Sequence, residues 1–364
     1  MTNISKPEGV PMATKQDLSS AGLDFDAVSR WLCDTVAANG GAVDAPLHFR
    51  QIPGGRSNLT FEVTDASGRR WALRRPPTGH VLPSAHDMVR EHLIMSALGE
   101  TDVPVPTMTG LCTDHEVTGT DFFVMEWVDG HVVRTAKEAR GFELDIRHTM
   151  AHSVIDNMAK IHQVDIDEVG LGNFAKRTGY LERQLQRWKG QVDATESHPP
   201  SVIGEAFDEI SARLPTDSLT RLVHGDYRLD NTIVDNDGNV IAVLDWELTT
   251  LGDPLADVGA MLCYWARPND DVVALTDPPT LADGFLERDE VIARYEREIG
   301  RPIGDVGFYH AFATWRLACI LHGVVDRYRA GTMGDGDDFD PDAWEAQVEQ
   351  LASMSLDIIG ESAT

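Results

Sequence analysis

The sequence is poor in cysteine and in basic residues, and each shortage excludes classes of protein. Its four cysteines lie far apart and form no C-x-x-C pair, which argues against a zinc site or a disulfide framework. Lysine and arginine together number 31 against 59 aspartates and glutamates, so the net charge is −28. Because such a surface repels nucleic-acid phosphates and anionic membranes, we expect neither as a partner.

Long apolar runs and P-loops are also absent. No run of about 18 apolar residues is present, so we expect no membrane span. The first twenty residues contain no apolar stretch of signal-peptide length, and they predict a flexible N-terminal arm, residues 1–20, on a cytoplasmic protein. The sequence has no G-x-x-x-x-G-K-[ST], which excludes a P-loop kinase. A length of 364 residues with 42% hydrophobic content predicts two domains or lobes.

The chain changes character near residue 128. Residues 21–128 are rich in strand signals, and we predict one lobe there. Helical spacing is found at 24–38 and 85–98. The predicted strands are 47–52, 59–65, 70–75 and 121–128.

Residues 129–364 predict a second, mostly helical lobe. Amphipathic segments cover 149–164, 179–192 and 308–331. A single strand signal interrupts them, because 232–234 and 240–244 flank a turn of composition Asp-Asn-Asp-Gly. Together the two parts predict an α+β fold with a small antiparallel sheet lobe and a larger helical lobe.

The predicted hairpin carries the most informative residues. Antiparallel pairing brings the residues at its two open ends together, so Asn231 and Asp245 should be neighbours. Their side-chain oxygens are the type of ligand that Mg²⁺ prefers. Asp226 precedes the first strand, where it can orient an attacking hydroxyl or accept its proton.

The spacing of these residues matches a protein-kinase pattern. His224, Asp226 and Asn231 form H-x-D-x-x-x-x-N, and Asp245-Trp-Glu stands in the place of D-F-G. We therefore predict Asp226 and His224 as catalytic residues, with Asn231 and Asp245 as metal ligands. The alternative is that His224, Asp226 and Asn231 only cap turns.

Three segments carry a resemblance to a known family. LVHGDYRLDNTIVD, AVLDWE and LGDPLADVG resemble the aminoglycoside phosphotransferase and choline kinase superfamily. More narrowly, RTGYLERQLQRWKGQ and FYHAFATWRLACILHGVVDRYRAG resemble the bacterial branch related to the phosphotransferase domain that is fused to acyl-CoA dehydrogenase in animals. The resemblance runs from about residue 48 to residue 331. It implies a protein-kinase-like fold, ATP and Mg²⁺ as cofactors, and a structural role for Asp257, which would brace the catalytic loop through its backbone.

The N-terminal lobe fits the same scheme. Ser57 and Asn58 end a Gly-Gly-Arg-Ser-Asn segment that could cover the nucleotide phosphates, although a Gly-Gly pair is more often only a turn. Arg74 stands where the kinase V-A-I-K motif has its lysine, and Arg75 is the alternative. Glu91, on the following helix, is the expected ion-pair partner.

Residues 124–128 match the hinge strand of kinases. The backbone groups of Glu126 and Val128 would meet the adenine edge, and Met125 would line the back of the pocket. An ordinary buried strand is the alternative. The hinge interpretation depends on the position of the segment at the end of the strand-rich half.

The long helical segment 308–331 is expected to line the acceptor site. Trp315, Arg316 and His322 are the candidate substrate contacts, because related folds build their acceptor pocket from this region. The same helical spacing of aromatic residues also fits a buried core.

These features together predict an enzyme that moves the γ-phosphate of ATP to a hydroxyl of a small molecule, with ATP and Mg²⁺ held between the lobes. A nucleotide-binding pseudoenzyme with a regulatory role is the alternative, favoured by arginine in place of the usual lysine. A protein kinase is disfavoured, because the sequence lacks an A-P-E segment. The broad resemblance, to aminoglycoside phosphotransferases, implies an aminoglycoside as the acceptor. The narrower one, to the domain fused to acyl-CoA dehydrogenase, implies a hydroxyacyl-CoA, and we favour this over an antibiotic.

Overall fold

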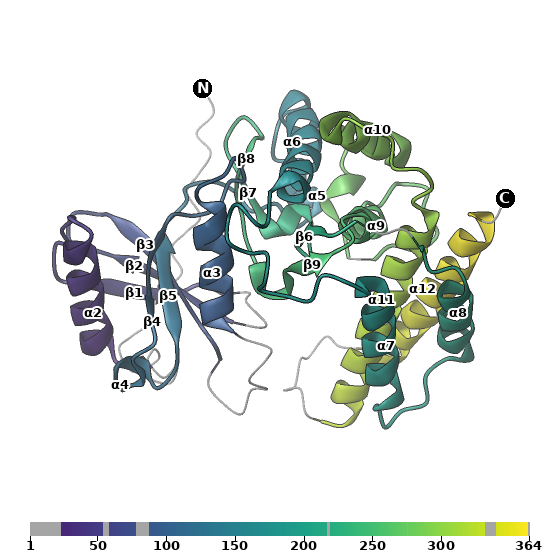
Figure 1. Cartoon of the computed structure of the whole chain (residues 1–364), viewed down its shortest axis with the longest axis horizontal. Helices are drawn as coiled ribbons and strands as arrows, with labels where there is room; N and C mark the ends of the chain where they lie inside the picture. The colour runs from purple at the N-terminus through teal and green to yellow at the C-terminus, as the bar shows by residue number, and fades with distance from the viewer. Residues whose placement is uncertain are drawn as a thin grey trace. The chain divides into compact units, whose positions relative to one another are not determined.

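The chain divides into two lobes. The computed structural model describes residues 23–53, 58–77, 87–216, 219–274, 276–331 and 340–362. The N-lobe comprises Met1–Glu100 and Val105–Asp129, and the C-lobe comprises Thr101–Pro104 and Gly130–Thr364 (Figure 1). Ser57 and the predicted N-terminal arm lie outside the described residues.

The N-lobe is built on one five-stranded antiparallel sheet. Its strands are β1 (His48–Gln51), β2 (Leu59–Thr64), β3 (Arg70–Arg75), β4 (Met108–Cys112) and β5 (Phe122–Glu126), in the order β1-β2-β3-β5-β4. Helix α2 (Phe25–Ala38) covers one face and α3 (Met88–Leu98) the other, with the short α4 (His115–Thr118) at the edge (Figure 1). Because side chains alternate along a strand, Trp71 and Leu73 of β3 enter the core under α2, whereas Arg74 faces α3.

The patterns of the sequence predict this lobe well, with two omissions, strand β4 and the four-residue helix α4. Helix α2 and strands β1, β2, β3 and β5 coincide with predicted segments to within two residues. Strand β4 was not predicted, because MTGLC is short and contains a glycine. The reason for the glycine is steric: a Cβ on Gly110 would lie 2.7 Å from Cγ2 of Thr35 on α2.

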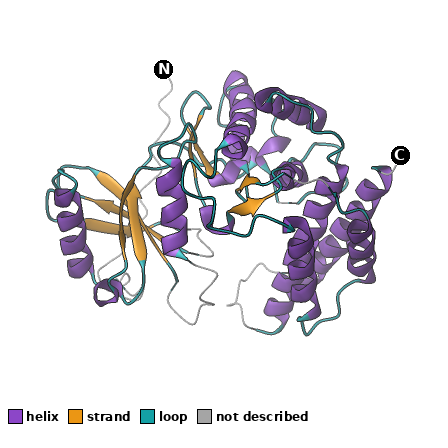
Figure 2. Cartoon of the chain, in the orientation of Figure 1, coloured by secondary structure: helices purple, strands orange, loops and turns teal. Residues whose placement is uncertain are grey.

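The C-lobe is mostly helical (Figure 2). Its helices are α5 (Ala136–Ala139), α6 (Leu144–Gln163), α7 (Tyr180–Asp193), α8 (Ser201–Ala212), α9 (Leu255–Tyr264), α10 (Arg288–Ile299), α11 (Gly307–Arg329) and α12 (Pro341–Glu361). Strand β6 (Arg221–Val223) pairs with β9 (Thr250–Gly252), and β7 (Thr232–Val234) pairs with β8 (Val240–Val243), both antiparallel. The fold is therefore the predicted two-lobed, kinase-like α+β fold. No described helix has the length and apolarity that a membrane span requires.

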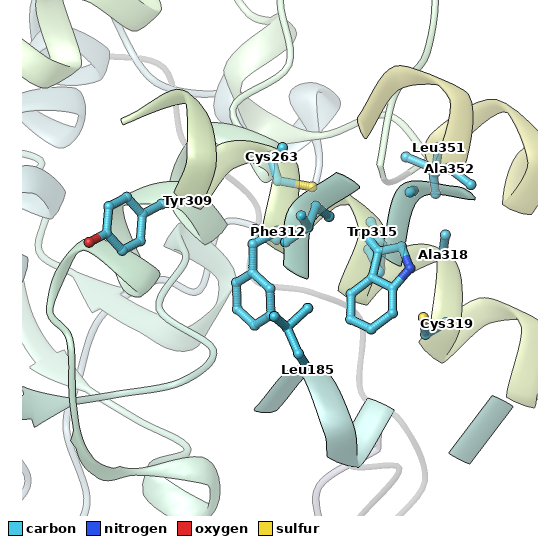
Figure 3. Packing of buried hydrophobic residues seen from close by; sticks show 14 of the residues in the cluster. Leu185, Cys263, Tyr309, Phe312, Trp315, Ala318, Cys319, Leu351 and Ala352 are labelled. Carbon is cyan, nitrogen blue, oxygen red and sulfur yellow. The ribbon is translucent and has the colours of Figure 1, made fainter. Parts of the chain in front are cut away.

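Helix α11 is the central element of the C-lobe. It packs against α7, α8, α9 and α12 and is buried along most of its length. Figure 3 shows Trp315 of α11 beside Phe312, Ala318 and Cys319. The neighbouring α9 was not predicted, because its segment LADVGAMLCY is buried on nearly all sides and has no apolar period to detect.

Candidate active site

The hairpin β7–β8 places the predicted metal ligands at one end. Thr232 pairs with Val243, and the next backbone amide, that of Leu244, donates to the carbonyl of Asn231 over 2.8 Å. Asp245 follows directly, with a left-handed φ of 67°. Such a φ is uncommon for a residue other than glycine and often marks a functional position. The backbone of Asn231 and that of Asp245 therefore lie close together, as expected.

Asn231 also holds Asp226. Its amide nitrogen Nδ2 donates to the backbone carbonyl of Asp226 over 2.8 Å and to the carboxylate oxygen Oδ2 over 3.0 Å. With both bonds made by the nitrogen, the oxygen Oδ1 is the side-chain atom left to accept or to coordinate. One amide thus orients the candidate catalytic carboxylate and keeps a hard oxygen for a cation.

The donor set fits Mg²⁺. Asn231 and Asp245 offer an amide oxygen and a carboxylate, both hard ligands. Among the described residues there is no group of three or more His, Cys, Asp or Glu arranged to hold a metal. Two protein ligands suffice for Mg²⁺, because this ion usually retains waters and takes substrate phosphates as further ligands.

His224, which the sequence predicted as a catalytic residue, has a different place. Its side chain is fully buried, with its ring against Tyr227 and Trp246. Its Nδ1 accepts from the Asp226 amide over 3.3 Å, so the ring proton lies on Nε2, which donates to the Leu244 carbonyl over 3.0 Å. A side chain without exposed surface cannot touch a substrate. His224 is a structural residue that links the candidate catalytic loop to the residue before Asp245.

Asp257, at the start of α9, binds the backbone of the loop that precedes Asp226. Its carboxylate accepts from the amide of His224 over 2.7 Å and from that of Gly225 over 2.9 Å. His162 of α6 adds a third hydrogen bond, of 3.1 Å, and lies 2.7 Å from the hydroxyl of Tyr295. This is the backbone contact that the resemblance implied for Asp257.

The pKa of Asp257 reflects two opposing effects. Burial by itself would raise it, since the carboxylate is shielded from water. The hydrogen bond and the positive potential of His162, together with His224 and the Gly225 amide, outweigh burial and lower the pKa below its ordinary value of 3.8. The ionised form therefore holds the catalytic loop.

The three substrate candidates of α11 are all buried. Trp315 has no exposed surface, and its Nε1 donates to the carbonyl of Ile203 over 3.0 Å, so its predicted contact with substrate is wrong. His322 lies 3.0 Å from the Thr195 hydroxyl and is equally enclosed. Arg316 donates from Nη2 to the carbonyl of Gly225 over 2.8 Å. These three side chains serve the core and the loop, because the helix that carries them is buried on most sides.

The sequence interpretation missed Arg228. Its guanidinium lies 3.4 Å from Oδ1 of Asp226 and 3.0 Å from Oδ2 of Asp230, and it stacks 5.1 Å from the ring centroid of Tyr264. Burial is the main reason why the pKa of Asp230 is raised; Arg228 opposes the rise and Asp226 adds to it. Arg228 and Asp230 lie inside the H-x-D-x-x-x-x-N motif at positions that the motif does not specify, so the spacing gave no signal for them.

In the N-lobe, the structure decides between the two candidate arginines. Nε of Arg74 lies 3.2 Å from Oε2 of Glu91, whose residue is only 2% exposed. Arg75 points to the opposite face of the sheet, and its Nε donates to the carbonyl of Pro76 over 3.3 Å. Arg74 is therefore the arginine that pairs with Glu91 of α3, which confirms the predicted ion pair.

The remaining N-lobe candidates lie around β5 and β2. Met125 is buried in β5, and Glu126 ends that strand with an exposed carboxylate 2.9 Å from Nη2 of Arg69. The amide of Glu126 donates to the carbonyl of Thr107 over 2.8 Å. Val128 follows, partly exposed, and Asn58 is buried just before β2.

Comparison with known proteins agrees with this geometry. A family model described as the phosphotransferase enzyme family matches residues 48–299. The chain belongs to this family. Acyl-CoA dehydrogenase family member 10 of Mus musculus is 34% identical over 89% of the chain, and family member 11 of Homo sapiens is 30% identical over 92%. The chain spans 30% and 43% of these two relatives.

Solved structures extend the comparison. A candidate aminoglycoside phosphotransferase from Ralstonia eutropha has a TM-score of 0.79 and 31% identity, covering 93% of this chain and 98% of its own. Choline kinase from Cryptosporidium parvum shares the fold at a TM-score of 0.63 and 14% identity. The match covers 93% of this chain and 96% of the choline kinase. The enzyme APH(2″)-IIa, solved as a ternary complex with streptomycin and ATP, shares the fold at a TM-score of 0.55 and 14% identity. The match covers 91% of this chain and 96% of that enzyme. The chain is thus a member of the phosphotransferase enzyme family with the fold of these small-molecule kinases.

Proposed function

We propose that the protein transfers the γ-phosphate of ATP to a hydroxyl group of a small molecule in a Mg²⁺-dependent reaction. The observation that carries the proposal is the pair of hydrogen bonds from Asn231 to Asp226 at the open end of the hairpin. They fix a carboxylate beside two hard oxygen ligands, which is the combination that phosphoryl transfer uses. Solved relatives of the fold support the choice of ATP, since one of them was solved as a ternary complex with streptomycin and ATP.

Each residue has a chemical role in this proposal. Asp226 orients the acceptor hydroxyl and takes its proton as the hydroxyl oxygen bonds to the γ-phosphorus; the bond from that phosphorus to the β,γ-bridging oxygen breaks, and ADP leaves. Asn231 and Asp245 would hold Mg²⁺, which neutralises phosphate charge when bound. Arg74, held by Glu91, would neutralise phosphate from the N-lobe. Ser57, Asn58, Met125, Glu126 and Val128 remain the proposed nucleotide contacts.

For the acceptor we propose a hydroxyacyl thioester of coenzyme A. The support is the name of the relatives, which are called acyl-CoA dehydrogenase family members and of which this chain matches less than half. An aminoglycoside is the second candidate, supported by the Ralstonia protein, which is described as a candidate aminoglycoside phosphotransferase. The composition supports a cytoplasmic location, which we also propose.

A transfer assay with a binding control tests the proposal. Purified protein is incubated with ATP–Mg²⁺ and a panel of hydroxyacyl-CoAs and aminoglycosides, and mass spectrometry of each acceptor detects the gain of one phosphate. We expect Asp226→Asn to lower transfer by about 10³-fold or more while ATP still binds, because the proton acceptor is lost and the fold is kept. Asp237→Asn, in the exposed turn of the same hairpin, is the matched control and should transfer normally.

The outcomes separate the proposed enzyme from a pseudoenzyme. ATP binding without transfer to any acceptor, or to water, would favour a regulatory nucleotide-binding protein. Equal transfer by Asp226→Asn and wild type with the true acceptor would contradict the assigned role of Asp226.

A further inference from the structure

The backbone before Asp226 is held almost entirely by side chains. The amides of His224 and Gly225 donate to Asp257, and the carbonyl of His224 accepts from the Thr249 hydroxyl over 3.4 Å. After these residues comes the peptide that joins Gly225 to Asp226. Its orientation sets the direction in which the Asp226 side chain leaves the backbone.

This peptide is bound at both of its ends. Its carbonyl oxygen, on Gly225, accepts from Nη2 of Arg316 over 2.8 Å, and its N–H, on Asp226, donates to Nδ1 of His224 over 3.3 Å. A peptide unit is planar, with its oxygen and hydrogen on opposite sides. Two bonds at opposite sides of one plane define the rotation of that plane.

Glycine makes such a restraint necessary. Gly225 has a φ of 88°, and a Cβ at this position would lie 2.8 Å from the carbonyl oxygen of Leu248. The close approach requires glycine, and glycine also leaves the adjoining peptide free to rotate at little cost. The loop therefore needs a restraint from outside its own backbone to keep one orientation.

Arg316 is well suited to provide it. The residue is 8% exposed, lies on the buried helix α11, and has its guanidinium 6.0 Å from the ring centroid of Trp188. Within the described part of the chain, the Gly225 carbonyl is its hydrogen-bond acceptor. A hydrogen bond from a charged donor is stronger than one between neutral groups, particularly away from water.

We infer that Arg316 is a positioning residue for phosphoryl transfer: it keeps the Gly225–Asp226 peptide from rotating and so fixes the Asp226 carboxylate in its working direction. The inference rests on the proposed function, in which Asp226 is the proton acceptor. It replaces the predicted contact of Arg316 with substrate by a contact with the catalytic loop. Helix α11 thereby becomes part of the catalytic machinery without touching a reactant.

Kinetics of Arg316 variants provide the first test. Arg316→Met keeps the length and apolar packing of the side chain and removes the donor. We expect kcat to fall by about 100-fold, with the KM for ATP–Mg²⁺ changed by less than about threefold, because misplacement of a reacting group affects the transition state rather than nucleotide binding. Arg316→Lys retains a charged donor and should recover part of kcat. Transfer to an acceptor is the readout, or hydrolysis of ATP by water if no acceptor is found.

Chemical rescue and a matched control follow. Guanidinium chloride at low millimolar concentration should raise kcat of Arg316→Ala, since the free ion can enter the space left by the side chain and donate to the Gly225 carbonyl. The matched control is Arg147→Met in α6. It removes a similar bond, in which Arg147 donates over 3.0 Å to the carbonyl of Phe142, just before that helix, and it should leave kcat unchanged. Rescue of the alanine variant without any effect on wild type separates donation to the loop from a general loss of stability.

A crystal structure of Arg316→Met, or of Arg316→Ala if the first variant does not fold, tests the geometry directly, with Arg316→Lys as the variant that keeps the donor. We expect the Gly225 carbonyl to be rotated in Arg316→Met and retained in Arg316→Lys. Unchanged kcat in Arg316→Met, or reduced kcat without rescue and with the peptide in place, would overturn the inference. If the wild type neither transfers phosphate nor hydrolyses ATP, the proposed function fails, while the position of the peptide still decides the role of Arg316.

Discussion

The two lobes hold their candidate functional residues by different means. In the N-lobe, Arg74 sits in the middle of a regular sheet, so the backbone ladder of β2, β3 and β5 fixes it, and its side chain forms an ion pair with Glu91. In the C-lobe, residues 224–226 belong to no strand or helix, and buried side chains from α9 and α11 bind their backbone.

Single substitutions should therefore have different consequences in the two lobes. A side chain in the sheet can be changed without moving its neighbours, since the ladder remains. The catalytic loop depends on distant side chains, so a change in α9 or α11 should move the loop itself. N-lobe variants should therefore alter nucleotide affinity, and C-lobe variants should alter kcat and stability.

Among the residues that support the site without touching a reactant, the largest effect is expected for Asp257→Asn. The amide retains one acceptor oxygen but turns an NH₂ group toward a backbone N–H for which Asp257 is the acceptor within the described residues. We expect the free energy of unfolding to fall by about 2–4 kcal/mol, and kcat by about 100-fold, because a buried donor is left unpaired and the loop is released. Urea unfolding and steady-state kinetics measure both. A variant as stable and as active as wild type would show that the loop does not depend on this carboxylate.

A smaller effect is expected for Arg74→Met in the N-lobe. Loss of one charged contact to phosphate should raise the KM for ATP–Mg²⁺ about tenfold, with kcat at saturating ATP changed little. Glu91→Gln should act in the same direction but more weakly, since it only loosens the arginine. If Arg74→Met instead lowered kcat at saturating ATP as much as Asp257→Asn, the contrast between the lobes would fail.

The smallest effect concerns pH. The pKa of Asp257 is lower in the folded protein than its ordinary value of 3.8, so the folded state favours the ionised carboxylate. Its contribution to stability is present above about pH 3.8 and is lost as the pH falls through the lower, folded pKa. Urea unfolding between about pH 6 and about pH 3 should show a steeper loss for wild type than for Asp257→Asn. Parallel curves for the two proteins would exclude this linkage.

The sequence predicted the parts of the fold that have a local signature. Helix α2, strand β3 and the β7–β8 hairpin follow from periodicity and turn composition. The catalytic role of residues 224–231 is still a prediction from their spacing. The roles of His224 and Arg316 could not be predicted, because both depend on which backbone atoms tertiary packing brings within reach. A motif identifies a residue as part of a loop but does not show whether its side chain faces the substrate or the core. Burial decided that question for His224, Trp315 and His322.

The most direct measurement of the central claim compares three proteins in one assay, in which transfer of the γ-phosphate is followed at increasing ATP–Mg²⁺. We expect wild type to transfer phosphate, Arg74→Met to reach a similar kcat at a higher ATP concentration, and Asp226→Asn to bind ATP without transfer. Transfer by Asp226→Asn at the rate of wild type would contradict the assignment of Asp226 as the proton acceptor.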